Sequence, residues 1–435
     1  MRLNMNFINK MAFLSRSRSL TLSVLVSFTL MFTAGDCGAV IVLNPAKPLI
    51  KTGIEVLKSS KFKQLEGKRI ALVTNPTGVD DNLVSTIDLL FAAKNVKLVA
   101  LFAPEHGVRG DVYAGGAVEN TVDSATGVPV YSIYGKNLKP SPDLLRGVDA
   151  IVYDIQDNGC RSYTFISTLG KIMEAAAEND KEVIVLDRPN PLGGEKVEGS
   201  LVEDGYISFV SQFKIPYLYG LTVGELAQLI NGENLVGKQC RLTVIKMNGW
   251  RRSMTYDDTR LPWILPSPHV PQAITSFFYP ASGILGELGY LSIGVGYTLP
   301  FQIFAAPWID ANRFSAALNS LNLPGVMFRP ICVKPYYSVF SGQNIQGVQF
   351  FITDYKKAAL SEIQFYVMQV IAELYPDRAV FAKANESRFR MFDLVCGSNY
   401  IRETFSQTNK ASSILNFWNK DVKSFKELSK GYYLY

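Results

Sequence analysis

The stretch NVKLVALFAPEHGVRG, residues 95–110, decides the fold of this chain. It begins with an apolar run, 96–102, that is rich in β-forming residues and too short for a helix of ordinary length. The run stops at Pro104, and Glu105 and His106 follow at once. Open α/β sheets bind their ligands at the carboxyl ends of the strands, so titratable side chains at such an end indicate a site. A polar turn that closes the strand is the alternative.

The alternation of strand and helix continues on both sides of this stretch. Short apolar runs that end at turn-forming residues predict strands, and apolar residues at helical spacing predict helices between them. The predicted strands are 69–75, 96–103, 129–134, 150–155, 182–187 and 241–246, and the predicted helices are 82–94, 162–178 and 223–230. Nearly continuous apolar strands alternating with amphipathic helices indicate an α/β fold with a parallel sheet covered on both faces.

A second, smaller domain is predicted after this alternation ends. Five prolines crowd the chain between Pro262 and Pro280, and we interpret 261–280 as the crossover between domains. The elements predicted beyond it are strands at 328–333 and 348–353 and a helix over 359–375. The sequence therefore predicts an α/β domain over 40–265 and a mixed α+β domain over 266–435.

The first 39 residues have the pattern of an export signal. Basic residues precede an uncharged apolar run, 19–35, and small residues suitable for cleavage follow it. We expect the mature protein to be periplasmic or secreted. The alternatives are an uncleaved membrane anchor, since the run is near the lower limit of spanning length, and a lipoprotein attached at Cys37, which the preceding Asp36 disfavours. No later segment is apolar enough to span a bilayer, so we predict no membrane contact beyond this signal.

Composition excludes several classes of partner and cofactor. The formal charge is +6 over 435 residues, and no basic patch with interleaved aromatics occurs, so we expect no nucleic-acid partner. No GxGxxG follows the first strand, and no Walker sequence, GxSxG elbow or Cys-His neighbour is present. The four cysteines other than Cys37 are too widely spaced for a zinc pattern, although one disulfide suits an exported protein. We therefore predict no cofactor.

Polar side chains stand where four of the predicted strands end. Because the carboxyl ends of parallel strands lie along one edge, we expect these side chains to meet in a single crevice. They are Asn75 after the first strand, Glu105 and His106 after the second, Asp154 and Asp157 at the fourth, and Arg188 and Asn190 after the fifth. A turn-closing role could explain any one of them but explains four such ends poorly.

Carboxylates, amides, arginine and tyrosine are the groups from which carbohydrate sites are built. Cleavage of a glycosidic bond needs a carboxylic acid that protonates the leaving oxygen and usually a second carboxylate. The same Glu105, His106, Asp154 and Asp157 could instead bind an oxygen-preferring metal ion. No His-x-His or His-x-x-x-His pair anchors such a site, so we predict no metal.

Five segments carry a family resemblance. They are PEHGVRG (104–110), DIQDNGCRSYTF (154–165), DRPNPLGGEKVEGS (187–200), YGLTVGELAQLIN (219–231) and WILPSP (263–268). They resemble the exo-β-N-acetylmuramidase (NamZ-like) family, formerly a domain of unknown function, from about Gly53 to the end of the chain. The resemblance implies a Rossmann-like N-terminal domain, a smaller C-terminal domain and an active site in the cleft between them. It also implies removal of terminal N-acetylmuramic acid from the non-reducing ends of peptidoglycan fragments.

Site residues follow from the resemblance motif by motif. Glu105 takes the place of the catalytic acid, with His106 beside it. The second motif supplies sugar contacts and a second carboxylate from Asp154, Asp157, Arg161 and Tyr163. The third motif supplies Arg188, Asn190 and Glu198, and an arginine there could pair with the lactyl carboxylate that distinguishes N-acetylmuramic acid from N-acetylglucosamine. For every residue other than Glu105 and His106, the alternative is a hydrogen bond or ion pair that fixes a loop.

The chain departs from the family pattern on the side that the second domain contributes. His269 stands where the family has Asn, residues 288–290 after Glu287 read Leu-Gly-Tyr where Gly-Thr-Asn is usual, and Val295 replaces an Arg. We include His269 and Glu287 among the predicted substrate contacts. These changes leave the catalytic end intact and bear on which sugar is accepted.

Two further hypotheses share this crevice. A non-catalytic, two-domain periplasmic sugar-binding protein would need no acid, and a metal-dependent deacetylase would need an ion. For the hydrolase, the second step could use Asp154, Asp157 or the substrate's own acetamido group. The choice depends on the separation of the carboxylates.

Overall fold

The computed structural model describes residues 48–110, 112–113, 115–116 and 118–435. The predicted export signal, 1–39, and the alternative attachment point Cys37 lie outside these residues. Within the described part of the chain, no helix is long and apolar enough to cross a membrane.

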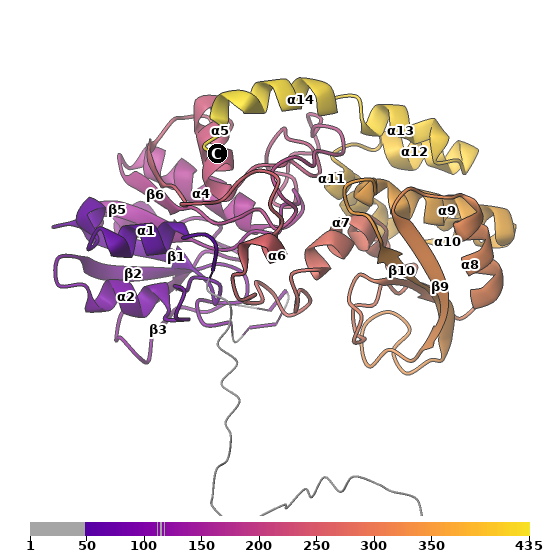
Figure 1. Ribbon diagram of the computed structural model, residues 1–435, viewed down its shortest axis with the longest axis horizontal. Helices are drawn as coiled ribbons and strands as arrows, with labels where there is room; N and C mark the ends of the chain where they lie inside the picture. The colour runs from indigo at the N-terminus through magenta and orange to yellow at the C-terminus, as the bar shows by residue number, and fades with distance from the viewer. Residues whose placement is uncertain (1–47, 111, 114, 117) are drawn as a thin grey trace, which may run out of the picture. The chain divides into compact units, whose positions relative to one another are not determined.

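A seven-stranded sheet forms the larger half of the molecule (Figure 1), and its spatial order is β3-β4-β2-β1-β5-β6-β7. The strands are β1 (Arg69–Thr74), β2 (Lys97–Ala103), β3 (Thr121–Val122), β4 (Pro129–Ser132), β5 (Ala150–Asp154), β6 (Glu182–Leu186) and β7 (Arg241–Ile245). All neighbours pair in parallel except β3, which pairs antiparallel with β4. The predicted parallel α/β sheet is confirmed.

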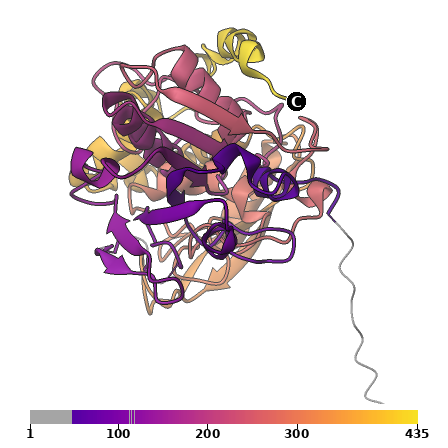
Figure 2. The ribbon, with the colours of Figure 1, turned by 90° about the vertical axis from the view of Figure 1, so that its left-hand side faces the viewer.

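Alternate residues of the central strands face two separate cores. Ile70 and Leu72 pack in the core that includes α1 (Gly53–Ser59) and α2 (Thr86–Ala92). Ala71 and Val73 face the core on the other side, which includes α4 (Phe165–Glu178) and α5 (Val223–Gly232). Figures 1 and 2 show the indigo helices α1 and α2 on one side of the strands and the magenta and rose helices α4 and α5 on the other. This two-sided burial explains why the strands are continuous apolar runs rather than alternating ones.

The chain order creates a switch point beside β1. From β1 the chain moves outward through β2 to β4 and then returns to β5 on the other side of β1. In open α/β sheets the loops diverge at such a point and leave a crevice at the carboxyl ends of the strands. The loops after β1, β2 and β5 therefore border the place where a ligand is expected.

A smaller antiparallel sheet lies in the other half, with order β8-β10-β9. Its strands are β8 (Ile303–Ala306), β9 (Val326–Val333) and β10 (Ile345–Ile352), and the longest helices around it are α8 (Ala311–Ser320) and α9 (Ile363–Leu374). The remaining α-helices are α3 (Pro142–Leu145), α6 (Tyr256–Thr259), α7 (Thr275–Gly286), α10 (Val380–Lys383), α11 (Phe389–Cys396), α12 (Tyr400–Thr408), α13 (Ser412–Trp418) and α14 (Val422–Ser429). The predicted α+β character of this region is confirmed.

Helix α7 is absent from the sequence prediction because Pro280 lies inside it. Proline removes one backbone donor from a helix and usually ends it. Here Gln364 of α9 donates to the Pro280 carbonyl at 2.9 Å and accepts from the Leu285 amide at 3.0 Å. Most of the predicted crossover 261–280 is irregular chain, and its last residues belong to this helix.

The end of the chain returns to the larger half, where it lies beside α5 (Figure 1). The Tyr435 hydroxyl donates to Asp187 Oδ2 and accepts from the Met247 amide, each at 2.7 Å. The Leu434 amide donates to Glu225 Oε1 at 2.9 Å. The boundary at 265/266 stays a prediction, but residues from the far end of the predicted second domain pack against the first.

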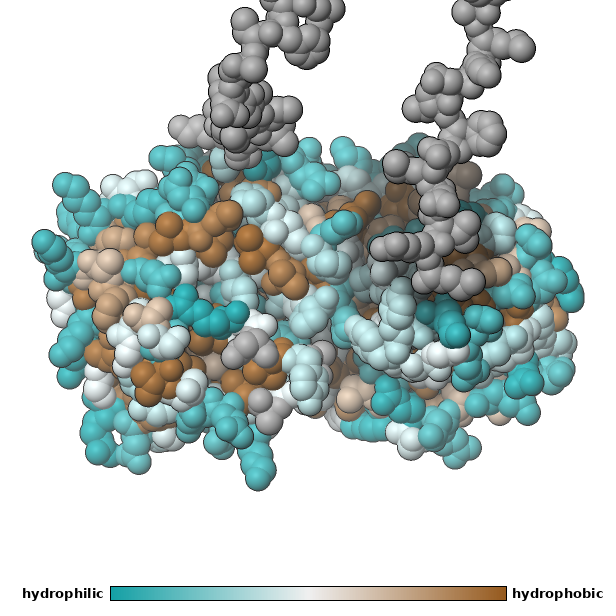
Figure 3. Space-filling model, turned by 90° about the horizontal axis from the view of Figure 1, so that it is seen from below, coloured by the Kyte–Doolittle hydropathy of each residue, from teal (hydrophilic) through white to brown (hydrophobic). Residues whose placement is uncertain are grey.

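Apolar side chains gather on one part of the surface. Figure 3 shows them in brown on the left half of the face seen from below, the half that carries α2 and β3 in Figure 1. The exposed large apolar residues of these segments and of the turn before α2 are Leu83, Val84, Phe91 and Val122.

Candidate functional site

Glu105 lies two residues after the end of β2 and is half-buried. Its two carboxyl oxygens have unequal surroundings. Oε1 accepts from the Tyr134 hydroxyl at 2.8 Å and from the Gly115 amide at 3.1 Å. Oε2 accepts from the Thr164 hydroxyl, at the start of α4, at 3.2 Å. Burial, and next the Glu105 carboxylate, raise the pKa of Tyr134, which therefore remains a hydrogen-bond donor.

His106 is held rigidly beside Glu105. Its backbone φ is 73°, in the left-handed region that residues other than glycine rarely adopt. The ring is 5% exposed, and Nδ1 lies 3.0 Å from the Val112 carbonyl oxygen. A carbonyl can only accept, so Nδ1 carries the hydrogen and, in the neutral ring, Nε2 carries the lone pair.

Asp157 has one unoccupied oxygen in a buried position. Oδ2 accepts from the Gly159 amide at 2.8 Å and from the Tyr219 hydroxyl, whereas Oδ1 has no hydrogen-bond partner among the described residues. Burial raises the pKa of Asp157 to about 6. Such a carboxyl group is partly protonated near neutral pH, as acid-base chemistry requires.

Tyr163 is packed among aromatic rings. Its ring packs edge-to-face on Phe165 and Tyr279, and the residue is 8% exposed. Burial, and then the charges of Asp157 and Glu105, raise the pKa of the Tyr163 hydroxyl. Both Asp157 and Glu105 therefore act on the Tyr163 hydroxyl.

Asp154 and Arg188 are placed differently from expectation. Strands β5 and β6 are neighbours, so these two strand-end side chains meet in a bidentate pair, with Arg188 Nη2 2.9 Å from Asp154 Oδ2. Thr86 also donates to Asp154, and Arg188 Nη2 donates to the Val79 carbonyl at 3.0 Å. Asp154 is fully buried and Arg188 is 5% exposed. We expected both to face a ligand, and instead they satisfy each other.

Arg161 is also engaged by the protein itself. It is fully buried, and its guanidinium group donates to four main-chain carbonyls, those of Ser200, Ile215, Val395 and Cys396. Burial lowers the pKa of Arg161 to about 10. The position expected to contact sugar thus ties the loop after β5 to the end of α11.

Asn190 and Glu198, from the third motif, hold loops in place. Asn190 accepts from the Leu192 amide at 2.9 Å and donates to the Leu221 carbonyl at 2.9 Å. Glu198 accepts from the Leu360 amide at 3.1 Å and from the Ser361 amide at 2.8 Å, which joins it to the turn before α9. These contacts match the loop-fixing alternative considered for both residues.

The segment 263–270 crosses the ends of the strands. Asn75 Nδ2 donates to the Pro266 carbonyl at 3.3 Å, while Asn75 Oδ1 accepts from the Thr77 amide at 3.0 Å. His269, farther along this segment, has Nε2 2.9 Å from the Tyr337 hydroxyl. Burial, and next His106, lower the pKa of His269.

Glu287 lies at the end of α7, where Arg388 donates to its main-chain carbonyl at 2.7 Å. Burial raises the pKa of its side chain. The structure shows no contact between Glu287 and the residues grouped around Glu105 within the described part of the chain.

Three site residues are missing from the sequence prediction. Tyr134 ends a predicted strand, so the strand-end rule that selected Glu105 could have found it. Thr164 lies inside the second motif, but a hydroxyl carries little signal by itself. Tyr337 stands in an irregular segment after β9, and no feature of the sequence relates it to His269.

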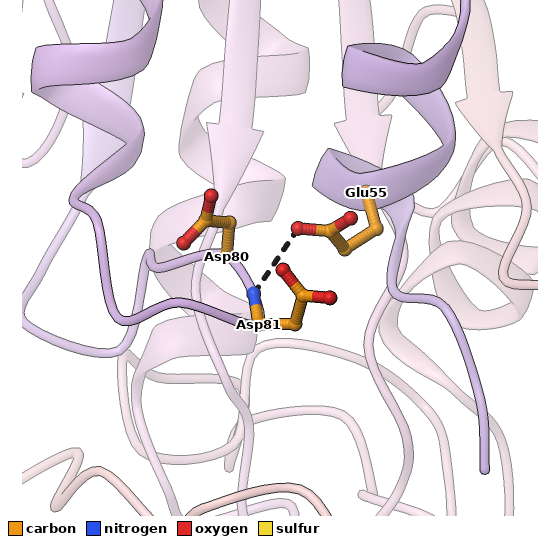
Figure 4. Close-up of side chains that lie close together, drawn as sticks. All are labelled: Glu55, Asp80 and Asp81. Atoms are coloured by element: carbon orange, nitrogen blue, oxygen red, sulfur yellow. Dashed lines mark hydrogen bonds between the residues drawn. The ribbon is translucent and has the colours of Figure 1, made fainter. Parts of the chain in front are cut away.

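An acidic cluster, Glu55, Asp80 and Asp81, lies elsewhere at the sheet edge, and its carboxylate oxygens are within 4.8 Å of one another (Figure 4). Lys58 Nζ lies 2.9 Å from Glu55 Oε1, 2.6 Å from Asp80 Oδ2 and 3.7 Å from Asp81 Oδ1. The ammonium group supplies the positive charge that the three carboxylates need. The four cysteines among the described residues, Cys160, Cys240, Cys332 and Cys396, are free thiols.

Comparison with known proteins identifies the family. Residues 70–274 match the model of the N-terminal part of exo-beta-N-acetylmuramidase NamZ, and residues 277–435 match that of its C-terminal part. The peptidoglycan beta-N-acetylmuramidase NamZ of Bacillus subtilis (strain 168) is 44% identical over 389 residues, 89% of this chain and 92% of that protein.

Two solved structures of DUF1343 family proteins from Bacteroides fragilis NCTC 9343 have the same fold. One is 63% identical with a TM-score of 0.86, and the other is 30% identical with a TM-score of 0.69. Each match covers 89% of this chain and 99% of the other. The chain therefore belongs to the exo-β-N-acetylmuramidase NamZ family of glycoside hydrolases.

Proposed function

We propose that this protein removes terminal β-N-acetylmuramic acid from the non-reducing ends of peptidoglycan fragments, with Glu105 as the general acid. The single observation that carries the proposal is the unequal hydrogen bonding of the Glu105 carboxyl group at a strand end. The name of the Bacillus subtilis relative, a peptidoglycan beta-N-acetylmuramidase, supports the substrate class.

The surroundings of Glu105 select the oxygen that carries the proton. Oε1 receives the Gly115 N–H, which can only donate, and the Tyr134 hydroxyl, so it behaves as the carbonyl oxygen. Oε2 is approached only by the Thr164 hydroxyl among the described residues, and a hydroxyl rotates between donating and accepting. The acid proton therefore resides on Oε2, from which it passes to the leaving oxygen. Thr164 then donates to the carboxylate that remains.

We assign the second carboxyl group to Asp157 rather than to Asp154. Asp154 uses both oxygens to hold Arg188 and Thr86. Asp157 keeps Oδ1 without a partner among the described residues. Asp157 is thus the group available to attack the anomeric carbon or to orient the acetamido group of the substrate.

The contacts between the two halves disfavour the periplasmic binding-protein hypothesis. Such proteins close by a hinge around their ligand. Here buried polar groups bridge the halves, because Arg161 donates to the Val395 and Cys396 carbonyls and Glu198 accepts from the Leu360 and Ser361 amides. Opening a hinge would leave these groups without partners at a high cost in free energy.

The direct test uses a chromogenic β-N-acetylmuraminide beside the matching β-N-acetylglucosaminide. We expect turnover of the muraminide by the wild type and its loss in Glu105→Gln. The matched control is Glu66→Gln, at an exposed position away from the strand ends. If the wild type binds the sugar but shows no turnover between pH 5 and 8, the hydrolase hypothesis is wrong and the binding-protein hypothesis is favoured.

We also propose that the protein acts outside the cytoplasm after its leader is removed. The proposal rests on the basic residues and apolar run within residues 1–39. Intact-mass measurement of protein recovered from its native host would identify the mature N-terminus. A lipid-modified Cys37 or an uncleaved Met1 would overturn the cleaved form.

A further inference from the structure

A cavity of about 640 Å³ lies beside the end of β9 in the smaller half of the molecule. Two of its lining residues, Tyr297 and Tyr336, form the tyrosine platform, in which the rings stack with centroids 5.8 Å apart and an interplanar angle of 21°. Tyr336 is 72% exposed, so most of its ring is free to contact a ligand. The cavity is within the usual size of small-molecule sites, about 300–1,000 Å³.

The loop that presents Tyr336 is held in one conformation. Residues 334–344 connect β9 to β10, and the Tyr336 amide donates to the Gly296 carbonyl at 2.8 Å. The Ser341 hydroxyl donates to the Tyr336 carbonyl at 2.9 Å. A Cβ at position 296 would collide with the Tyr337 carbonyl, so this close approach requires glycine. A ring that is already fixed loses little freedom when a ligand binds, which favours affinity.

Hydrogen bonds connect this loop to the segment that crosses the strand ends. The hydroxyl of Tyr337, the residue after Tyr336, lies 2.9 Å from His269 Nε2. Three residues before His269, the Pro266 carbonyl accepts from Asn75 Nδ2 at 3.3 Å. The segment 263–270 therefore contacts the platform loop at one end and the residue that follows β1 at the other.

Asn75 in turn lies next to the strand end that carries Glu105. Strand β1, which precedes Asn75, pairs in parallel with β2, which precedes Glu105, and Val73 is opposite Phe102. Neighbouring strands lie about 4.8 Å apart, so the loops that carry Asn75 and Glu105 begin side by side. The platform and the proposed acid are thus joined by a short series of direct contacts.

A sugar ring suits the tyrosine platform. The C–H groups on the face of a pyranose pack on aromatic rings, and its hydroxyl and acetamido groups need polar partners. Lys334 and Asn344 line the same cavity, and their side chains form no hydrogen bond among the described residues. Lys334 is the single charged residue among the described lining residues, which suits a neutral or anionic glycan.

We propose that the tyrosine platform binds the glycan chain beyond the sugar that is removed, so that the protein favours muramyl-terminated oligosaccharides over short glycosides. This inference rests on the proposed function. When the terminal sugar is held at Glu105, the rest of the chain is attached through the leaving oxygen and extends away from the acid. The ligand of the platform is this leaving chain, an oligosaccharide of N-acetylated amino sugars.

The kinetic test compares a muramyl-terminated tetrasaccharide with the chromogenic muraminide, which lacks the chain. Tyr336→Ala should raise KM for the tetrasaccharide about five- to tenfold, the scale of one aromatic contact, and leave kcat unchanged. Both constants for the muraminide should change less than about twofold. Tyr336→Phe should behave as the wild type, since the Tyr336 hydroxyl forms no hydrogen bond among the described residues. The matched control is Tyr400→Ala, because Tyr400 of α12 is also exposed and stacks on Phe417.

Cys332 reports occupancy of the cavity without turnover. It lines the cavity and is exposed, whereas the other three cysteines of the described residues are buried. In the Glu105→Gln background, alkylation of Cys332 by iodoacetamide, followed by peptide mass spectrometry, should slow when the tetrasaccharide is added. Free N-acetylmuramic acid should give no protection. The added change Tyr336→Ala should abolish the protection at the same tetrasaccharide concentration.

Three results would overturn the proposal. Equal effects of Tyr336→Ala on the two substrates would indicate a general loss of folding or catalysis. An unchanged KM for the tetrasaccharide, or a Cys332 that the tetrasaccharide leaves unprotected, would show that the chain does not occupy the platform. Failure of the proposed function has a different signature, since the wild type would then release sugar from neither substrate. Protection of Cys332 would still decide whether the platform binds the glycan.

Discussion

At two places along the carboxyl ends of the strands, a carboxylate lies beside a basic side chain. The two places differ in the contacts that the rest of the protein makes with them. After β2, Glu105 and His106 have carboxyl and ring atoms that remain open to a ligand. After β5 and β6, Asp154 and Arg188 are buried and bind each other. Position at a strand end is therefore insufficient to make a catalytic residue. Whether the fold already supplies a buried counter-ion decides between chemistry and stability.

The largest effect is expected at Glu105, where a substitution should lower activity without lowering stability. Glu105→Gln should lower kcat by between about 10² and 10⁴, the usual contribution of a general acid, or up to about 5.5 kcal/mol. Its melting temperature should stay within a few degrees of the wild type. Stopped assays on the muraminide and thermal melts measure the two quantities. A variant that melts early and retains kcat would contradict the assignment.

The pair of Asp154 and Arg188 should respond in the opposite way, with a loss of stability rather than of activity. Asp154→Asn leaves Arg188 buried without a counter-ion, so the free energy of unfolding should fall by about 3–5 kcal/mol. Urea denaturation measures this loss, and active-site titration shows whether the molecules that remain folded keep their kcat. Asp143→Asn is the matched control, because its pair with Arg146 is exposed. A drop in kcat without a loss of stability would give Asp154 a catalytic role.

Asp157 is buried like Asp154 but keeps one carboxyl oxygen without a partner among the described residues. The pH dependence of stability should reveal this carboxyl group. Its folded pKa, about 6, lies above the usual 3.8, so the native state holds the proton over that window while the unfolded chain releases it. The associated stability is present below about pH 4 and is lost, by up to about 3 kcal/mol, as the pH rises through 6. Urea denaturation from pH 4 to 7.5 should show a flatter profile in Asp157→Asn than in the wild type. Asp204→Asn, at an exposed side chain, should leave the profile unchanged.

The smallest effect concerns the support of Glu105. Tyr134→Phe removes one of the two donors to Oε1 and should lower kcat about tenfold with little change in KM, roughly 1.4 kcal/mol. The pH profile of kcat should change as well, because Tyr134 donates to Glu105 Oε1. Tyr131→Phe, in β4 itself, is the matched control, since its hydroxyl makes no hydrogen bond among the described residues. An unchanged pH profile would reduce Tyr134 to a packing residue.

The sheet could be predicted from the sequence because strand signals are local. Runs such as 96–102 are apolar, short and ended by proline, and nothing elsewhere in the chain alters that pattern. Helix α7 could not be predicted, because Pro280 inside it is a local signal that ends helices, whereas the contacts that hold it come from Gln364, a side chain 84 residues away. Rules that use neighbouring residues therefore predict the elements that neighbouring residues stabilise.

The candidate site shows the same division between residues predicted from local sequence and residues whose partners are distant in the chain. Glu105 and His106 were selected by position and composition, and the structure places them at the strand end as the pattern indicates. Arg161 and Glu198 have the residue types of a sugar site, but their partners lie 235 and 163 residues away, at Cys396 and Ser361. The sequence shows each polar side chain but not the distant main-chain group that forms its hydrogen bond. The same reasoning explains why Tyr337 could not be connected to His269.

The docking of Tyr435 on Asp187 and Met247 has a consequence for biosynthesis. Asp187 precedes the Arg188 that pairs with Asp154, so Tyr435 adds a contact to a buried polar network at the end of β6. Tyr435 is synthesised after β6 and α5, so the polar groups at the corner of these two elements stay hydrated until it arrives. A fragment that stops at residue 265 should therefore emerge as an incomplete fold.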